Sequence, residues 1–251
     1  MVTVLKLGGS VVTDKTAAET IDEAALSRAS TSIGAAIREE GKSDLVLVHG
    51  GGSFGHHNAD AHGVSDETGS HDVDAVADIH GAMGRLNAAV VSGLREAGVP
   101  AVPVHPFSLG HRDADGDLSL PAGGVATLRA EGFTPVLHGD LVPHSGAGVT
   151  VLSGDEIAVE LAEALGADRV GLCSTVPGVL DRDGNVVRRI ASTAEAETYV
   201  GESDATDVTG GMAGKVDALL GLSAPARIFD LDGLEDFLAG GSPGTEIRRE
   251  R

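Results

Sequence analysis

The chain has 251 residues, 41% of them hydrophobic, and its 38 acidic residues against 18 lysines and arginines give a formal charge of −20. This length supports one sizeable core, and the negative field excludes nucleic acid as a partner. No apolar run reaches the roughly 18 residues of a membrane span, no basic hydrophobic leader opens the chain, and the single cysteine, Cys173, excludes an internal disulfide. We therefore expect a cytoplasmic protein without membrane contact, in which Cys173 is a small buried hydrophobe.

The predicted elements alternate between strands and helices. Strand-like apolar runs are expected at Thr3 to Leu7, Asp44 to His49, Pro100 to Val104, Thr134 to His138, Arg169 to Cys173 and Arg227 to Phe229. Helical patterns are expected at about Ile21 to Glu40, Val73 to Ala97, Asp155 to Leu165 and Met212 to Leu222. This order predicts an α/β fold, an open αβα sandwich with a largely parallel central sheet.

Two polar segments carry Asp-Gly turns between strand-like flanks. They are "HRDADGDLSL", residues 111–120, and "LDRDGNVVRR", residues 180–189. Such turns predict hairpins, which we expect at the edge of the sheet. The whole chain is expected to form one domain, with an internal boundary near Gly148 to Ser153 that separates an N-terminal lobe of about 1–150 from a C-terminal lobe of about 151–251.

Lysine is scarce in this chain. The four lysines are Lys6, Lys15, Lys42 and Lys215, and aromatic residues make up 2% of the sequence. Scattered acids with little lysine indicate a surface adapted to concentrated salt, where screening makes the large charge tolerable, although an acidic mesophilic protein stays open as the alternative. The remaining lysines are candidates for chemistry, except Lys42 in "EEGKSD", which is expected to be a solvated residue at a helix end.

Glycine clusters recur where strands end and helices begin. They are "KLGGS", "HGGGSFG", "SGDE" and "DVTGGMAGK", with Lys6 beside the first and Lys215 inside the last. Glycine brings backbone N–H groups close to a ligand, and helix N-termini attract anions. Each cluster alone could be a tight turn, but together with the lysines they predict that a long polyanion is held between two lobes.

Two common nucleotide-binding motifs are absent. The sequence has no G-x-x-x-x-G-K-[ST] loop, since Val216 follows Lys215, and no G-x-G-x-x-G after the first strand. Neither H-E-x-x-H nor a cysteine set for zinc is present. No side chain is predicted as a metal ligand.

Six segments resemble one known family along nearly the whole chain. They are "VLKLGGSVVTDK", "VHGGGSFGHH", "VLHGD", "LSGDEIAVELAEAL", "VPGVLDRDG" and "DVTGGMAGK". The pattern resembles the amino acid kinase family and, within it, the isopentenyl phosphate kinases of archaea, with the acidic surface pointing to a haloarchaeal form. The resemblance implies ATP-dependent phosphorylation of isopentenyl phosphate to isopentenyl diphosphate with Mg²⁺ bridging nucleotide oxygens, an N-terminal acceptor lobe and a C-terminal nucleotide lobe. We also expect a homodimer.

The resemblance also implies roles for individual residues. The implied catalytic residues are Lys6, Lys15, His56 and Lys215. The implied nucleotide-binding residues are Lys6, Gly8, Gly9, Ser10, Gly51, Asp155, Ser174, Gly210, Gly211, Gly214 and Lys215. The implied acceptor-binding residues are Gly50, Gly51, Gly55, His56, Met83 and Gly154. In this scheme Gly50, Gly51 and Gly55 present N–H groups, and Asp155 orients lysines. The stretch Thr175-Val176-Pro177 departs from relatives that carry an aspartate there.

An apolar stripe follows the acceptor loop. Ile79, Met83, Leu86 and Val90 recur at helical spacing, and such a stripe is either core or ligand wall. Met83 has small neighbours that could leave room for a short branched hydrocarbon. An acidic amino acid would instead need a cationic clamp, for which Arg85 is the single arginine between Ala61 and Gly93.

Three functions remain open from the sequence: a kinase of isopentenyl phosphate, a kinase of another anion such as an amino-acid carboxylate or a phosphonate, and a non-catalytic nucleotide sensor. A phosphate monoester is largely dianionic at neutral pH and needs no general base, so positioning and cationic stabilisation suffice. His49 and His138 are interpreted as structural and His57 as a neighbour of the site. Asp140 and Asp207 are either turn residues or partners of lysines.

Overall fold

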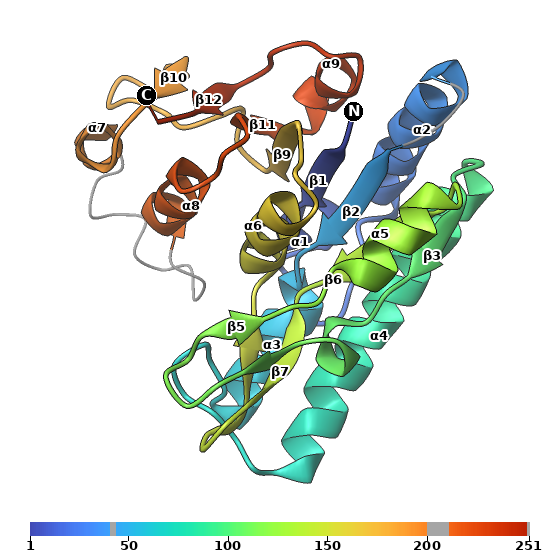
Figure 1. Cartoon of the computed structure of the whole chain (residues 1–251), viewed down its shortest axis with the longest axis vertical. Helices are drawn as coiled ribbons and strands as arrows, with labels where there is room; N and C mark the ends of the chain where they lie inside the picture. The colour runs from blue at the N-terminus through green and yellow to red at the C-terminus, as the bar shows by residue number, and fades with distance from the viewer. Residues whose placement is uncertain (41–43, 200–210, 250–251) are drawn as a thin grey trace.

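The computed structural model describes residues 1–40, 44–199 and 211–249, which are built around an eight-stranded sheet (Figure 1). The strand order is β10-β12-β11-β9-β1-β2-β6-β3. The strands are β1 (Thr3–Leu7), β2 (Leu45–His49), β3 (Ala101–Pro103), β6 (Thr134–His138), β9 (Arg169–Ser174), β10 (Arg189–Ile190), β11 (Ala226–Asp230) and β12 (Thr245–Ile247). Their pairs are parallel except that of β11 with β12, so the predicted largely parallel sheet is confirmed.

Helices cover both faces of this sheet (Figure 1). One face carries α1 (Gly9–Val12), α2 (Glu23–Glu40), α3 (Gly52–His62), α4 (Val73–Glu96) and α9 (Leu234–Leu238), and the other carries α5 (Gly123–Ala130), α6 (Gly154–Ala164), α7 (Thr193–Tyr199) and α8 (Gly211–Leu220). Successive strand residues point to opposite faces, so Leu5 and Leu47 join one core while Val4 and Val46 join the other. No helix in the described ranges has the length and apolar content to cross a membrane.

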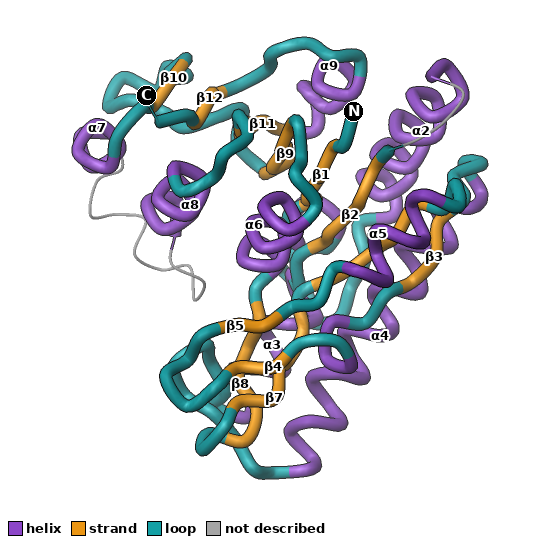
Figure 2. The backbone as a smooth tube through the Cα atoms, in the orientation of Figure 1, coloured by secondary structure: helices purple, strands orange, loops and turns teal. Residues whose placement is uncertain are grey.

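A second, four-stranded sheet lies beside α3 and the first half of α4 (Figure 2). Its order is β5 (Leu118–Ser119), β4 (His111–Arg112), β7 (Asp140–His144) and β8 (Gly148–Leu152). The predicted hairpin at 111–120 is therefore present but belongs to this sheet, so its placement at the edge of the main sheet is wrong. The segment at 180–189 forms an antiparallel bridge between Leu180 and Val186 rather than two strands.

The glycine-rich loops at the ends of β1 and β2 touch each other through their backbones. Gly50 N–H donates to Leu7 O at 2.9 Å, and a Cβ on Gly50 would lie 2.6 Å from Gly9 N. A Cβ on Gly9 would likewise collide with the backbone of Gly52, whose φ is +49°. Glycine is required here for close approach and, at Gly52, for its left-handed backbone. These contacts set α1 and α3 next to each other.

Two histidines end neighbouring strands beneath these loops, and both are buried. His49 Nε2 lies 3.1 Å from Asn87 Oδ1, and His138 Nδ1–H donates to Gly139 O at 2.9 Å. Burial lowers the pKa of both imidazoles, with that of His138 falling to about 3, helped by neighbouring His49. The interpretation of both residues as structural agrees with this packing.

We predict that His138 makes the fold sensitive to acid. Its folded pKa is about 3 and its unfolded pKa is ordinarily near 6.5, so between these values the unfolded chain binds a proton that the folded chain excludes. Its contribution to stability is complete above the unfolded pKa and is lost as pH falls. His138→Asn keeps the donor to Gly139 and should reduce the pH slope of the unfolding free energy by about 1.4 kcal/mol per pH unit below 6.5. Urea unfolding at pH 7 and pH 5 measures this, and parallel profiles for the two proteins would contradict it.

Candidate active site

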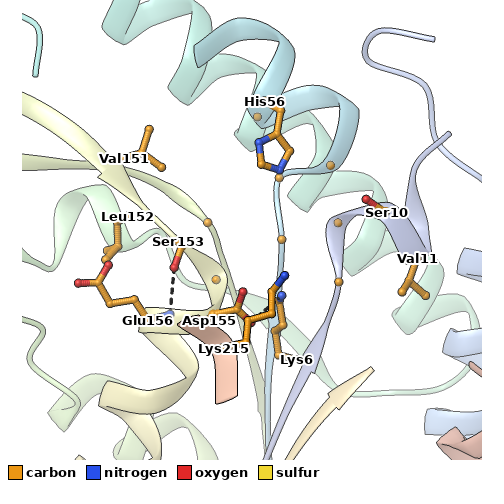
Figure 3. Close-up of a pocket in the computed structure, with 18 of the residues that line it drawn as sticks. Lys6, Ser10, Val11, His56, Val151, Leu152, Ser153, Asp155, Glu156 and Lys215 are labelled. Atoms are coloured by element: carbon orange, nitrogen blue, oxygen red, sulfur yellow. Dashed lines mark hydrogen bonds and ion pairs between the residues drawn. The ribbon is translucent and has the colours of Figure 1, made fainter. Parts of the chain in front are cut away.

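A cavity of about 180 Å³ opens where the glycine-rich loops meet the second sheet (Figure 3). Loop residues after β1 and β2 line it, as do the first residues of α6, the end of β9 and two residues of α8, Met212 and Lys215. Because parallel strands end at one edge of a sheet, these segments converge there although they are far apart in the sequence. The topology thus brings together all four residues predicted as catalytic: Lys6, Lys15, His56 and Lys215.

Lys6 and Asp155 form a nearly buried ion pair at one end of the cavity. Lys6 Nζ lies 2.8 Å from Asp155 Oδ1, and the two side chains are 9% and 14% exposed. Lys215 reaches the same place from α8 (Figure 3). Asp155 offsets the cost of holding the Lys6 ammonium away from water, and the pair fixes its direction. The predicted role of Asp155 in orienting a lysine agrees with this geometry.

Three helices begin at the cavity wall. α1 starts at Gly9, α3 at Gly52 and α6 at Gly154, and all three glycines line the cavity. The first N–H groups of a helix have no acceptor within the helix, so those that no capping residue or neighbour binds are available to an anion. The N-cap of α6, Ser153, accepts a hydrogen bond from Glu156 N at 3.1 Å and so fixes the start of that helix. Amides and lysines therefore face one space.

Three glycine amides of these loops already have acceptors within the protein. Gly8 N–H donates to Cys173 O at 2.8 Å, Gly50 N–H to Leu7 O and Gly55 N–H to Gly51 O at 3.0 Å. The N–H groups of Gly50 and Gly55 are therefore paired in the free protein, and their expected contact with the acceptor and the γ-phosphate stays a prediction. The two glycines also provide space, since a Cβ on Gly55 would lie 3.1 Å from Met83 Sδ. Gly51, the N-cap of α3, lines the cavity and stays a predicted donor of this loop.

His56 and Lys15 enter the cavity from different elements. His56 lies on α3, and its ring points toward the cavity across from Lys6 and Lys215 (Figure 3). Lys15 lies in the exposed loop after α1 and also lines the cavity. Other predicted residues that line it are Gly8, Gly9, Ser10, Gly51, Met83, Gly154, Asp155 and Ser174.

Those predicted glycines before Lys215 that the structure describes are not found in the cavity lining. Gly214 lies on α8 but does not line the cavity, and Gly211 is the first residue of that helix. Gly210 lies outside the described residues, as does Asp207.

Ser174 lines the cavity at the end of β9, next to Cys173. Burial raises the pKa of the Cys173 thiol to about 12, so it is inert as a nucleophile, in accord with the sequence prediction.

Apolar side chains also line the cavity. Ile79 and Met83 of the predicted stripe line the cavity, whereas Leu86 and Val90 pack in the core, so the stripe is both wall and core. Further apolar lining residues, which sequence analysis missed, are Ala59, Val64 and Val151. Val151 could not be found from the sequence, because β8 was not predicted.

Asp140 is a buried carboxylate in the cavity wall. His80 Nδ1 lies 3.0 Å and 2.8 Å from its two oxygens, and Leu141 N–H donates to Oδ1 at 2.8 Å. Burial raises the pKa of Asp140 to about 6, although His80 acts in the opposite direction. The sequence left Asp140 ambiguous between a turn residue and a partner of lysines, and gave no signal for His80. In the structure its carboxylate is hydrogen-bonded to a histidine, not to a lysine.

Comparison with known proteins identifies the family. The sequence profile of the amino acid kinase family matches residues 1–228. The chain is 59% identical to an isopentenyl phosphate kinase of Haloferax volcanii and 31% identical to one of Methanocaldococcus jannaschii, with 98% of both chains covered in each case. The X-ray structure of an isopentenyl phosphate kinase matches with a TM-score of 0.82 and 28% identity, covering 98% of each chain. The chain belongs to the amino acid kinase family.

Proposed function

We propose that this protein transfers the terminal phosphoryl group of ATP to isopentenyl phosphate and forms isopentenyl diphosphate. The observation that carries the proposal is one continuous cavity that joins lysines and helix amides to an apolar wall. An acceptor with an anionic head group and a short hydrocarbon tail matches such a cavity, because it also has a charged part and an apolar part. The similarity to isopentenyl phosphate kinases over 98% of the chain supports the same acceptor.

The residues present suit nucleotide phosphates. Lys6, Lys215 and the amides at the start of α1 would hold them, with Asp155 keeping Lys6 in place. Bound ATP supplies the phosphoryl group. Within the described ranges no cluster of three His, Cys, Asp or Glu residues could hold a metal ion. We therefore propose that Mg²⁺ is held mainly by nucleotide oxygens, as is usual for this small and strongly hydrated ion.

The acceptor phosphate would lie at the start of α3. His56 would donate a hydrogen bond to it, and Lys15 would offset the charge that spreads over the transferred group. No residue need remove a proton, because the attacking oxygen is already ionised. Acceptor contacts would then come from the N-terminal lobe, residues of about 1–150, and most nucleotide contacts from the C-terminal lobe, residues of about 151–251. The loop after β1 would contact both substrates. The homodimer and the cytoplasmic location stay predictions.

The alternative acceptors find less support in this cavity. Arg85 was the candidate clamp for an amino-acid carboxylate, but its Nη2 lies 2.6 Å from Glu19 Oε2 and it does not line the cavity. The apolar wall around Met83 offers such an acceptor no charged partner. A sensor without activity would not need Lys6, Lys15 and Lys215 to converge on one space.

We predict that isopentenyl phosphate is the best acceptor in a panel with ATP and Mg²⁺. The comparison acceptors are glutamate, N-acetylglutamate, UMP, carbamate and fosfomycin, and ADP release measures turnover in dilute buffer and in molar KCl. Other short allylic monophosphates should react more weakly, because the head group is the same while the apolar wall has a fixed size. Clear preference for a carboxylate acceptor would overturn the proposal.

A second prediction concerns His56. His56→Ala removes an oriented donor and should lower kcat/KM for isopentenyl phosphate by about 10²-fold or more, whereas the KM for ATP should change little. His56→Gln keeps an N–H of similar reach and should retain appreciable activity. His57→Ala is the matched control on the neighbouring residue. Equal losses at the two positions would instead indicate that the substitutions disturb α3.

A further inference from the structure

Glu19 has an unusual backbone. Its φ is +47°, and it is the one residue other than glycine with a positive φ in the described ranges. Side chains other than those of Asn and Asp rarely adopt this conformation, and it persists only where surrounding contacts hold it. Such positions are concentrated at functional sites, so the contacts of Glu19 bear on the cavity nearby.

The Glu19 carboxylate joins two helices. Oε2 accepts from Arg85 Nη2 of α4 at 2.6 Å, and Oε1 accepts from Asn58 Nδ2 of α3 at 3.0 Å. Its backbone N–H donates to Ser53 O of α3 at 3.3 Å. The hydrogen bond from Arg85, followed by that from Asn58, lowers the pKa of Glu19, so the carboxylate is ionised at neutral pH.

Glu19 belongs to a closed loop that carries Lys15. Asp14 N–H donates to Thr20 O at 2.9 Å, and Thr13 forms an isolated antiparallel β-bridge with Ile21. The two ends of the loop are therefore held together. Thr20 N–H in turn donates to Ser53 Oγ at 3.3 Å. At the first end of the loop, Thr13 Oγ1 accepts a hydrogen bond from Ser53 N–H at 3.0 Å. The loop is therefore held to α3 at both ends, and Glu19 adds the contact with α4.

The points of attachment on α3 flank His56. Ser53 lies three residues before His56 and Asn58 two residues after it. Lys15 is exposed and lines the cavity, and no hydrogen bond or ion pair to another described residue is found for its ammonium group. A flexible four-carbon side chain without a partner takes its position from the backbone that carries it. That backbone is held to α3 at Thr13, Thr20 and Glu19, and Glu19 also holds it to α4.

We propose that Glu19 is a positioning residue, which fixes the Lys15 loop to α3 and α4 and so places the Lys15 ammonium group relative to His56. The inference rests on the proposed function, in which Lys15 acts on the transferred phosphoryl group and His56 on the acceptor. Glu19 itself does not line the cavity. Its effect on the reaction therefore passes through Lys15.

The direct test compares two substitutions at this position. Glu19→Gly accommodates the backbone but removes the carboxylate, and should lower kcat by about 10- to 10²-fold, the scale of a misplaced catalytic group, with little change in the KM for ATP or in Tm. Glu19→Gln keeps the length and one acceptor, so its kcat should lie between those of Glu19→Gly and the wild type. Wild-type kcat in Glu19→Gly would overturn the proposal.

A double-mutant cycle separates positioning from a general structural effect. If Glu19 acts through Lys15, then Glu19→Gly in a Lys15→Ala background should change kcat by no more than about twofold. Losses that multiply, together with a lower Tm, would overturn the proposal. The control is Asp232→Asn, which breaks the exposed pair of Arg28 and Asp232, 2.7 Å apart and remote from the cavity lining, and should leave kcat unchanged.

The same variants distinguish this inference from the choice of acceptor. A wild-type protein that prefers another acceptor would overturn the substrate assignment alone, because the cycle can then be measured with that acceptor. A wild-type protein active on isopentenyl phosphate with an unaffected Glu19→Gly variant would overturn the positioning role alone.

Discussion

Backbone contact between the β1 and β2 loops places the charged groups of the cavity. A Cβ on Gly50 would lie 2.6 Å from Gly9 N, and the Gly50 N–H already donates to Leu7 O. Because no side chain separates the loops, α1 and α3 begin side by side, and their first amides face the same space. A side chain on either glycine would move the two helices apart, and with them Lys15 and His56. The two loops are therefore already in contact in the free protein, before any phosphate binds.

The few lysines of this acidic chain are concentrated at the cavity. The chain carries a formal charge of −20, yet three of its four lysines line one cavity. Lys6 is held there by Asp155 at 2.8 Å, so its charge is compensated in the free protein. Two highly charged phosphates can approach each other only where cations and amides offset their repulsion. In this account the protein therefore contributes cations and amides that offset this repulsion and holds the two phosphates in position for transfer. It needs no general base.

Much of the architecture could be predicted from sequence, but parts of the site could not. The apolar runs gave the main strands, and glycine clusters with lysines marked the cavity, because buried parallel strands and anion loops have strong local patterns. Helix α3 was missed because its "GSFGHH" start contains two glycines and forms through packing of Phe54 and Ala59 in the tertiary structure. The hairpin at 111–120 was assigned to the wrong sheet because its two-residue strands, β4 and β5, carry little periodicity. The other strands of the second sheet, β7 and β8, were not predicted. The pair of His80 and Asp140 joins residues 60 positions apart, which no local pattern reveals.

The central claim is that one cavity holds a nucleotide and an acceptor phosphate in line, and a bisubstrate analogue tests it most directly. Such a compound links adenosine through a phosphate chain to an isopentenyl group, and its inhibition is measured against each substrate in turn. The account predicts competition with both ATP and isopentenyl phosphate, and tighter binding than either substrate shows, because one ligand fills both parts of the cavity. Competition with ATP alone, with no gain from the isopentenyl group, would contradict the account.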